Sequence, residues 1–320
     1  MKYIDFHCDS LMVAYLNNQK DIYDMPDAML DLKRLNKSGA TAQFFAIFLR
    51  PGIHEKLPFD DRYTNKLIGI YENTINKYPH LIAKATNIQD IQKNEEEGKI
   101  SAFLTIEDGR IIRGRFDNLI NFYKKGVRLI TLTWNGVNCF GYPNSPDRKL
   151  MAKGLKPFGK EAITAMNSLG MLIDVSHLSD GGFYDVAAIS KKPFIASHSN
   201  CRSISPHPRN MTDDMIHVLG NSGGVMGLNF AGQFLNEDIN LSRSTLEKMG
   251  LHIKHILNLG GEDSLAIGTD FDGIENDLEI SSPDKMYMLF DYLKSIGVNE
   301  TQLEKMASKN AKRIIKDVLN

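Results

Sequence analysis

Residues 3–9 read YIDFHCD, a short stretch that predicts a buried strand ending in the pattern His-x-Asp. Side chains alternate between the two faces of a strand, so His7 and Asp9 point the same way, about 7 Å apart along the chain. An imidazole and a carboxylate side by side can chelate one divalent metal ion. A half-buried histidine bonded to a turn aspartate explains the same pattern, so the rest of the chain must decide.

Seven further apolar runs predict strands, at residues 42–49, 101–106, 127–133, 171–175, 193–196, 224–229 and 265–268. Helical patterns alternate with them, near 27–37, 60–78, 88–97, 116–124, 158–168, from 213 onward, and near 244–259, 283–295 and 301–318. This alternation implies parallel strands joined by right-handed crossovers. The near-continuous apolar runs are typical of strands covered on both faces.

Eight such units predict a closed (β/α)8 TIM barrel, formed by residues 1–320 as a single domain. An open doubly wound sheet is the alternative. No Gly-x-Gly-x-x-Gly sequence follows the first predicted strand, which argues against a dinucleotide-binding version of that sheet.

The composition argues against several classes of partner. The chain has 38 Lys and Arg against 39 Asp and Glu, a net charge of −1, and no basic stripe, so we expect neither nucleic acid nor a membrane surface as partner. No apolar run approaches the ~18 residues of a membrane span. The first predicted strand begins too near Met1 for a signal peptide. Three cysteines, odd in number and far apart, suit a reducing cytoplasm; they are Cys8, Cys139 and Cys201.

Residues of metal-ligand type occur at the ends of five predicted strands. In barrel enzymes the active site lies at the carboxyl ends of the strands. The candidates are His7, Asp9, Glu107, His177, His198 and Asp270. Each alone suits a turn or a buried polar residue, but their coincidence at one end of a barrel favours a metal site. Histidines with carboxylates suit zinc. Six groups exceed the needs of one tetrahedral ion, which indicates two metals, and Glu107 can bridge them.

The chain resembles the renal (membrane) dipeptidases, a metallopeptidase branch of the amidohydrolase barrels, over nearly its whole length. The resemblance depends on motifs that occur in the order of the family: His7-x-Asp9, Ile106-Glu107-Asp108-Gly109, Gly154-Leu155-x-Pro157-Phe158-Gly159, Asp174-Val175-Ser176-His177, Ser197-His198-Ser199, Arg209-Asn210-x-x-Asp213-Asp214, Gly268-Thr269-Asp270-Phe271-Asp272-Gly273 and Asn310-x-x-Arg313.

This resemblance implies a zinc-dependent dipeptidase with two Zn²⁺ per chain. One metal would be held by His7 and Asp9, the other by His177 and His198, with Glu107 bridging them. In such a site two cations that share a water lower its pKa from about 15.7 toward ~7 and supply hydroxide at neutral pH.

The resemblance also assigns roles to residues outside the ligand set. Arg209 would bind the C-terminal carboxylate of the substrate through a forked pair of hydrogen bonds. Asp270 would take the proton of the attacking water and return it to the leaving amine. The family it resembles contains homodimers that cleave dipeptides, including ones with a C-terminal D-residue, and some members open β-lactam rings.

One position departs from the family pattern. The fourth strand of the family typically ends in Leu-Thr-His, with the histidine near the scissile carbonyl, whereas this chain has Leu132-Thr133-Trp134. Trp134 offers one N–H donor and no titratable group, so we expect it to form a wall of the substrate site. Two alternatives to a dipeptidase therefore stay open. One is an amidohydrolase acting on another small amide or lactam, and the other is a catalytically silent metal-containing relative.

Overall fold

The computed structural model describes residues 1–50, 61–275 and 277–319. All of its named strands are parallel and belong to one sheet, which closes because β2 pairs with β4. The ring of eight consists of β1 (Tyr3–Cys8), β2 (Ala40–Phe48), β4 (Ile100–Glu107), β5 (Val127–Thr131), β6 (Leu172–Asp174), β7 (Ile195–Ser199), β8 (Val225–Leu228) and β9 (Leu265–Ile267). A ninth strand, β3 (Ile82–Lys84), pairs with the start of β4. The predicted (β/α)8 barrel is therefore confirmed.

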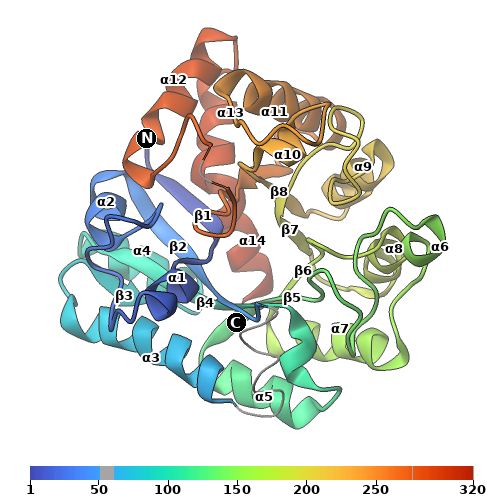
Figure 1. Ribbon diagram of the computed structural model, residues 1–320, viewed down its shortest axis with the longest axis horizontal. Coiled ribbons are helices and arrows are strands. Elements are labelled where there is room, and N and C mark those ends of the chain that lie inside the picture. The colour runs from blue at the N-terminus through green and yellow to red at the C-terminus, as the bar shows by residue number, and fades with distance from the viewer. Residues whose placement is uncertain (51–60, 276, 320) are drawn as a thin grey trace.

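The helices lie around this ring, most of them on its outside, while α14 (Asn310–Val318) crosses behind it (Figure 1). They are α1 (Ser10–Leu16), α2 (Leu32–Lys37), α3 (Arg62–Lys77), α4 (Ile88–Glu96), α5 (Phe116–Lys124), α6 (Arg148–Met151), α7 (Pro157–Leu169), α8 (Asp180–Ile189), α9 (Asp213–Asn221), α10 (Gly232–Leu235), α11 (Leu246–Gly260), α12 (Tyr287–Ser295), α13 (Glu300–Glu304) and α14 (Asn310–Val318). No helix in the described part of the chain is both long and apolar enough to cross a membrane.

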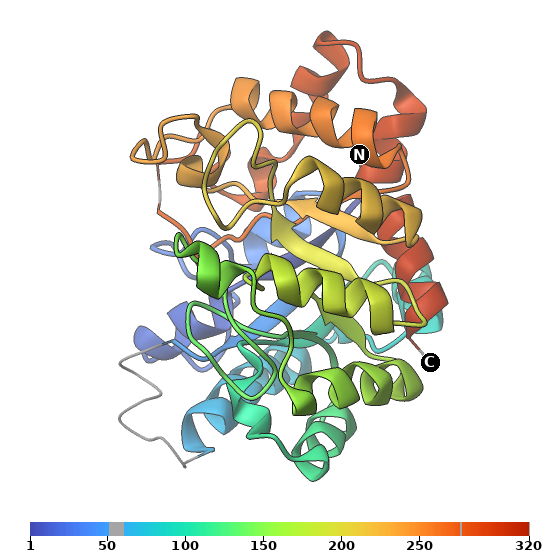
Figure 2. The ribbon, with the colours of Figure 1, turned by 90° about the vertical axis from the view of Figure 1, so that its right-hand side faces the viewer.

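The inside of the ring is filled by apolar side chains, not by solvent. The cluster consists of Ile4, Phe6, Ala42, Phe44, Phe103, Leu129, Leu172, Ile195, Val225 and Ala266 from the strands, together with Ala311, Ile314, Ile315 and Val318 of α14. The rings of Phe44 and Phe103 stack with centroids 4.5 Å apart. Helix α14 thus packs across the amino-terminal end of the barrel, opposite the loops that follow the strands (Figure 2).

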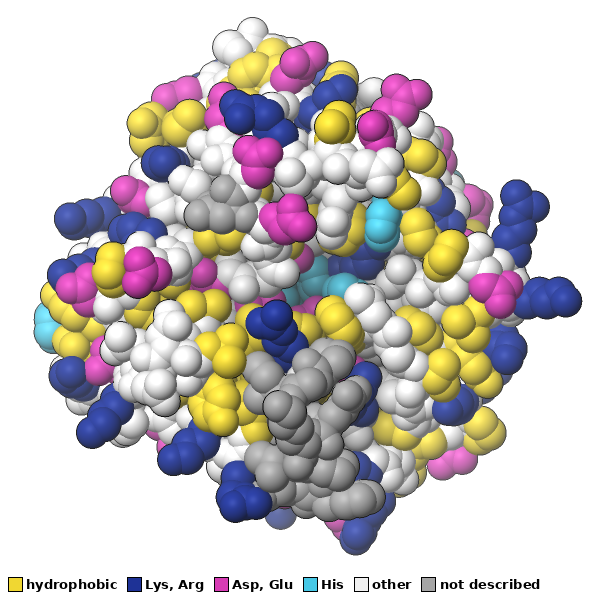
Figure 3. Space-filling model, in the orientation of Figure 1, with side chains coloured by type: hydrophobic (Ala, Val, Ile, Leu, Met, Phe, Trp, Pro, Cys, Tyr) yellow, Lys and Arg dark blue, Asp and Glu magenta, His cyan; other side chains and the backbone are white. Residues whose placement is uncertain are grey.

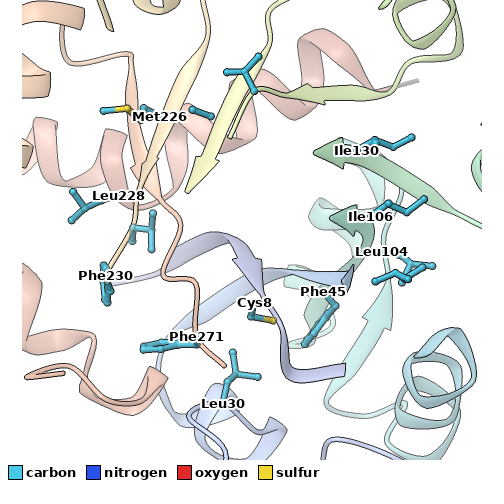
Figure 4. Close-up of a cluster of buried hydrophobic side chains, with 14 of the residues drawn as sticks. Cys8, Leu30, Phe45, Leu104, Ile106, Ile130, Met226, Leu228, Phe230 and Phe271 are labelled. Carbon is cyan, nitrogen blue, oxygen red and sulfur yellow. The ribbon is translucent and has the colours of Figure 1, made fainter. Parts of the chain in front are cut away.

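A second and larger apolar cluster joins the outer faces of the strands to the helices. Figure 4 shows part of it, with Phe45 of β2, Leu104 and Ile106 of β4, and Ile130 of β5 on neighbouring strands. The strands are therefore covered on both faces, which is why their sequences are near-continuous apolar runs with no alternation. These two layers leave the carboxyl ends of the strands as the place where polar side chains converge.

Each predicted strand overlaps an observed one, and their ends differ by three residues at most. The sequence prediction missed β3, which has three residues and one fully buried side chain. It also missed α1, α6, α8 and α10. The first turn of helix α8 contains Gly181 and Gly182, which are poor helix formers. Both are needed there, because a Cβ on Gly181 would overlap the carbonyl of Ala152 and one on Gly182 would overlap Leu178.

One predicted helix begins at the wrong residue, and another is interrupted. The helix predicted from residue 27 begins at Leu32, because the Asp31 side chain caps it by accepting from the N–H of Arg34. The helix predicted over 301–318 contains a π-helical turn at Lys305–Lys309 between α13 and α14. The side chain of Asn310, directly after this turn, donates to the carbonyls of Glu262 and Leu265 and so fixes the start of α14 at the barrel.

Candidate metal centre

The ligand-type residues predicted from the sequence converge at the carboxyl ends of the strands. They come from β1 and the residue after it, from the last position of β4, from β7, and from the turns after β6 and β9; they are His7, Asp9, Glu107, His198, His177 and Asp270. All six are buried. Figure 3 shows histidine and acidic side chains at the base of a hollow near the centre of this face.

His7 is the centre of the first group. Its Nε2 lies 3.6 Å from Oδ2 of Asp9, 3.4 Å from Oε2 of Glu107 and 3.6 Å from Oδ1 of Asp270. His7 and Asp9 share one face of the chain, as their spacing predicts. The ligand atoms of His7, Asp9 and Asp270 lie within 4.8 Å of one another, a separation that one cation can span.

The second group surrounds the other oxygen of Glu107. Its Oε1 lies 3.1 Å from Nε2 of His177 and 3.5 Å from Nε2 of His198, and the two Nε2 atoms are 3.1 Å apart. The ring of His198 also stacks on that of His7 with centroids 3.9 Å apart. Glu107 therefore stands between the two groups, with one carboxylate oxygen facing each.

Unpaired polar atoms in this cluster fit a cation. Both ring nitrogens of His7 and Oδ1 of Asp9 are buried and have no hydrogen-bond partner among the residues that the structure describes. Buried polar groups are rarely left unpaired, because the loss of hydration is costly. The backbone also leaves room around the carboxylates, since a Cβ on Gly273 would overlap Oδ2 of Asp9 and Oδ1 of Asp270. The donor set and its surroundings thus fit a site for divalent metal.

The pKa values of the residues in the cluster also fit a cation site. Burial raises the pKa of Glu107 to about 8, helped by the Asp9 carboxylate, and burial raises the pKa of Asp270 to about 7. Burial lowers the pKa of His7, but Glu107 and Asp9 outweigh it and raise that pKa well above its usual value. Burial lowers the pKa of His177 and His198 well below the usual value. Without a cation, Glu107 therefore largely retains a proton at neutral pH, and Asp270 retains one in part.

Two of these residues adopt a left-handed backbone conformation. His177 has φ 64° and Asp270 has φ 62°. Residues other than glycine are uncommon in this region, although Asn, Asp and His tolerate it best, and such strain concentrates at functional sites. Here each residue follows the end of a strand, and the turn directs its side chain into the barrel mouth.

Neighbouring polar residues that the sequence analysis did not single out hold these side chains. Oδ1 of Asn135 lies 3.2 Å from Nδ1 of His177. The amide of Asn229 donates to Oδ2 of Asp270 at 2.8 Å. Asn229 is also at the end of a predicted strand, and that position was the signal that could have identified it.

A cavity of about 120 Å³ opens above the cluster. Asp9, Glu107, His177 and Asp270 lie on its polar side, and its apolar side consists of Phe48, Trp134, Phe234 and Ile274. The ring of Trp134 is 5.2 Å from that of Phe48 and 6.2 Å from that of His177, measured between centroids. Trp134 thus lies on the wall of the cavity next to the second group, where an aromatic wall was expected.

Arg209 lies behind the cavity wall and, in the described part of the chain, does not line it. Its guanidinium is buried and donates from Nη1 to Oγ of Ser199 and from Nη2 to the carbonyl of His198. Its Nε is buried without a partner. The guanidinium is centred 5.8 Å from the ring of Phe234, a residue of the wall.

Solved structures share this fold over nearly the whole chain. The dipeptidase AC, a metallopeptidase of family M19, superposes with a TM-score of 0.90 at 24% identity and covers 100% of this chain and 99% of its own. A metallopeptidase from Rhodobacter sphaeroides, crystallised with a phosphinate mimic of the dipeptide L-Ala-D-Ala, superposes with a TM-score of 0.89 at 24% identity. That match covers 99% of each chain. These likenesses show the fold.

Sequence comparison shows the family. Dipeptidase verJ of Clonostachys rogersoniana is 31% identical over 302 residues, which cover 91% of this chain and 76% of that protein. An uncharacterized protein in the pqqA 5′ region of Klebsiella pneumoniae is 35% identical over 236 residues, 72% of this chain and 86% of its own. The family model of the membrane dipeptidases matches residues 1–320. The chain therefore belongs to the membrane dipeptidase family, peptidase family M19, and is a metallo-dipeptidase by membership.

Proposed function

We propose that this chain hydrolyses small dipeptides with two zinc ions bound at the barrel mouth. The observation that carries the proposal is the position of Glu107, whose two oxygens face different groups. Oε2 is 3.4 Å from Nε2 of His7, and Oε1 is 3.1 Å from Nε2 of His177. A carboxylate placed in this way can bridge two cations. His7 and Asp9 would complete the first site, and His177 and His198 the second.

Imidazole and carboxylate donors of this kind suit zinc. Bound zinc would lower the pKa of a shared water and polarise the peptide carbonyl, which supplies the nucleophile and stabilises developing charge. The protein contributes a fixed ligand set, because the ligands come from the ends of β1, β4, β6 and β7 or from the residues that directly follow them.

Asp270 is the proton carrier in this proposal. Its Oδ2 accepts from the amide of Asn229, while Oδ1 faces His7 at 3.6 Å and lies beside the cavity. Asn229 thus fixes the carboxylate and leaves one oxygen free to take a proton from water and give it to the leaving amine. A pKa near neutrality suits both transfers, and burial raises the pKa of Asp270 to about 7.

Arg209 would read the C-terminal carboxylate of the substrate. Its buried Nε and the remaining hydrogens of its Nη atoms are available for this, although Phe234 stands between the guanidinium and the cavity. The proposed role therefore requires Phe234 to move when substrate binds. The cavity volume of about 120 Å³ suits small residues. The L-Ala-D-Ala mimic bound by the Rhodobacter sphaeroides relative supports the inclusion of L–D dipeptides among the proposed substrates.

The proposal extends to the state of the protein in the cell. We propose a homodimer, by resemblance to the family, in which residues 1–320 form one catalytic domain. We also propose a cytoplasmic location. Its support is that Cys8, Cys139 and Cys201 are all unpaired, as expected in a compartment that keeps thiols reduced.

Elemental analysis combined with a substrate panel tests the proposal. Protein purified without chelator and reconstituted with zinc is expected to hold about two ions per chain and to release amino acids from small dipeptides. N-acyl amino acids and lactams in the same panel test the alternative amide substrates. A metal content near zero after reconstitution would refute the binuclear site. If the protein binds two ions but turns over only lactams or N-acyl amino acids, its substrate is one of these compounds and not a dipeptide.

A further inference from the structure

The two histidines proposed for the second metal have different partners on their far ring nitrogens. Nδ1 of His177 faces Oδ1 of Asn135, a residue exposed on the loop after β5. Nδ1 of His198 lies 2.6 Å from Oγ of Ser197, and both residues are fully buried. The bond to His198 is therefore the shorter of the two and is protected from water.

Ser197 is in turn hydrogen-bonded to a buried carboxylate, that of Asp174. Oγ of Ser197 donates to Oδ2 of Asp174 at 2.5 Å, and Asp174 has no exposed surface. Three further donors converge on the same carboxylate. Thr131 donates its hydroxyl to Oδ2, and the backbone N–H groups of Ser176 and Ser197 donate to Oδ1. Four donors satisfy an ionised carboxylate, which can only accept. Among the described residues no Lys, Arg or His forms an ion pair with Asp174.

The direction of these hydrogen bonds determines which nitrogen of His198 carries a proton. A serine hydroxyl has one hydrogen. Because that hydrogen points to Asp174, Oγ of Ser197 must accept from His198, so Nδ1 carries the ring proton. Nε2 then has its lone pair free, and it is this atom that faces Glu107 at 3.5 Å and His177 at 3.1 Å.

We infer that Asp174 and Ser197 act as positioning residues that hold His198 in the tautomer required for metal binding, through a carboxylate–serine–histidine relay. The inference is based on the proposed function, since it concerns the second metal of that site. A carboxylate at the far end of a metal-binding histidine fixes the ring and raises the basicity of the ligand nitrogen. In this chain the carboxylate acts through a hydroxyl. His177 has only the longer contact to the exposed Asn135, with no carboxylate behind it that the described residues show, so we expect His198 to determine most of the affinity of the second site.

Three substitutions separate the relay from ordinary packing. Ser197→Ala removes the hydroxyl and leaves the other three donors on Asp174. Asp174→Asn turns an acceptor into a donor, so the Ser197 hydroxyl reverses toward His198 and the proton moves to Nε2, which can no longer ligate. Thr131→Val is the matched control, because it removes a donor from the same Oδ2 without contact to the imidazole.

Zinc affinity, measured by competition with a chromogenic chelator, is the first readout. Loss of a partner that orients a metal ligand typically weakens affinity about 10–100-fold. We expect a loss of this size for one of the two ions in Ser197→Ala and at least as large a loss in Asp174→Asn, with affinity retained in Thr131→Val. Equal affinities in parent and Ser197→Ala would refute the relay, as would a loss in Thr131→Val as large as in Ser197→Ala.

The tautomer itself is the second readout and needs no metal. Nitrogen NMR of metal-free protein labelled in histidine, with the signal assigned by His198→Gln, is expected to show a proton on Nδ1 in the parent. In Asp174→Asn the proton should be on Nε2. A parent proton on Nε2 would overturn the inference. If the parent protein binds no metal but shows the expected tautomer, the proposed function is contradicted, while the hydrogen-bond relay from Asp174 to His198 is still supported. If Asp174→Asn does not fold, Ser197→Ala retains the test.

Discussion

Gly273 approaches the Asp9 carboxylate so closely that a Cβ at this position would overlap Oδ2 of Asp9. The same Cβ would also overlap Oδ1 of Asp270. Glycine is the residue that lets the backbone come this near to a ligand or its holders. The turn after β9 is therefore shaped around the two carboxylates.

Gly273→Ala should accordingly displace Asp9 or Asp270 and remove zinc from the first site. We expect about one ion per chain in place of two and a loss of most turnover, with the fold retained. The matched control is Gly69→Ala in α3, where a Cβ meets nothing within 4 Å. That change should raise stability slightly, by roughly 0.5–1 kcal/mol. Two tightly bound ions in Gly273→Ala would mean that the turn tolerates the methyl group and that its close approach has no role in binding.

Metal removal should make stability depend on pH. Acidic groups with a raised folded pKa contribute stability below their unfolded pKa and lose it as pH rises through the folded value. Glu107 at about 8 and Asp270 at about 7 behave in this way, and the raised pKa of His7 has the same sign. His177 and His198, whose pKa values are lowered, stay neutral above about pH 6.5.

The Tm of chelator-treated protein is therefore expected to fall between about pH 6.5 and 8. Added zinc replaces the bound protons, so it should raise Tm more at pH 8 than at pH 6.5. Differential scanning calorimetry of both forms across this range gives the comparison. A flat profile for the metal-free form would show that the carboxylates are hydrated or already paired when zinc is absent.

The proton-carrier role of Asp270 predicts a selective loss in Asp270→Asn. The amide can still accept from Asn229 through its oxygen, so the fold and much of the metal should be kept. It cannot accept and return a proton, and such transfer typically contributes ~10²–10⁴-fold. We expect kcat to fall within that range with Tm and zinc content near those of the parent. Near-normal turnover would assign Asp270 to structure instead.

Much of the fold followed from the sequence because its signals are local. Apolar runs covered on both faces identify the strands of the ring, and six polar residues at their ends identify the centre. Helix α8 was not predicted, because Gly181 and Gly182 disfavour a helix in sequence and their close packing against other residues is visible only in the folded chain. The hydrogen bonds of Asn135 and Ser197 to the histidines were not predicted for a similar reason. Polar residues beside a ligand in sequence are common, and only the three-dimensional structure shows which of them reaches an imidazole.

The position of Arg209 relative to the cavity was the feature that the sequence predicted least well. A buried arginine on a loop gives no sign of how far it stands from the cavity, and the structure places it behind Phe234. The proposed role still gives a sharp prediction. Arg209→Ala should raise KM for free dipeptides far more than for the corresponding C-terminal amides, because only the former offer a carboxylate to the fork.

Loss of the hydrogen bonds that Arg209 makes to Ser199 and to the His198 carbonyl should lower activity on both substrate classes equally. The amides are therefore the internal control for that structural contribution. Steady-state kinetics on matched pairs such as Ala-Ala and its amide measure the difference. Equal losses on the two would show that Arg209 supports His198 and does not read the substrate.

Trp134 provides the last prediction, because the motif resemblance implies a histidine at this position, where this chain has an indole. The indole lies on the cavity wall with Phe48, next to His177, and the proposed metal ligands are all present. Loss of one oxyanion donor typically costs on the order of 3–4 kcal/mol. A bound metal stabilises the same charge by several kcal/mol, so hydrolysis should be slowed but not abolished.

We therefore expect the zinc-loaded parent to cleave small L–L and L–D dipeptides. We expect Trp134→His to be faster and to accept larger side chains, since imidazole is smaller than indole. The two proteins are compared at equal zinc content on dipeptides of increasing side-chain size. If the parent cleaves none of them while Trp134→His gains activity, the natural chain is a silent relative and the proposed function is wrong.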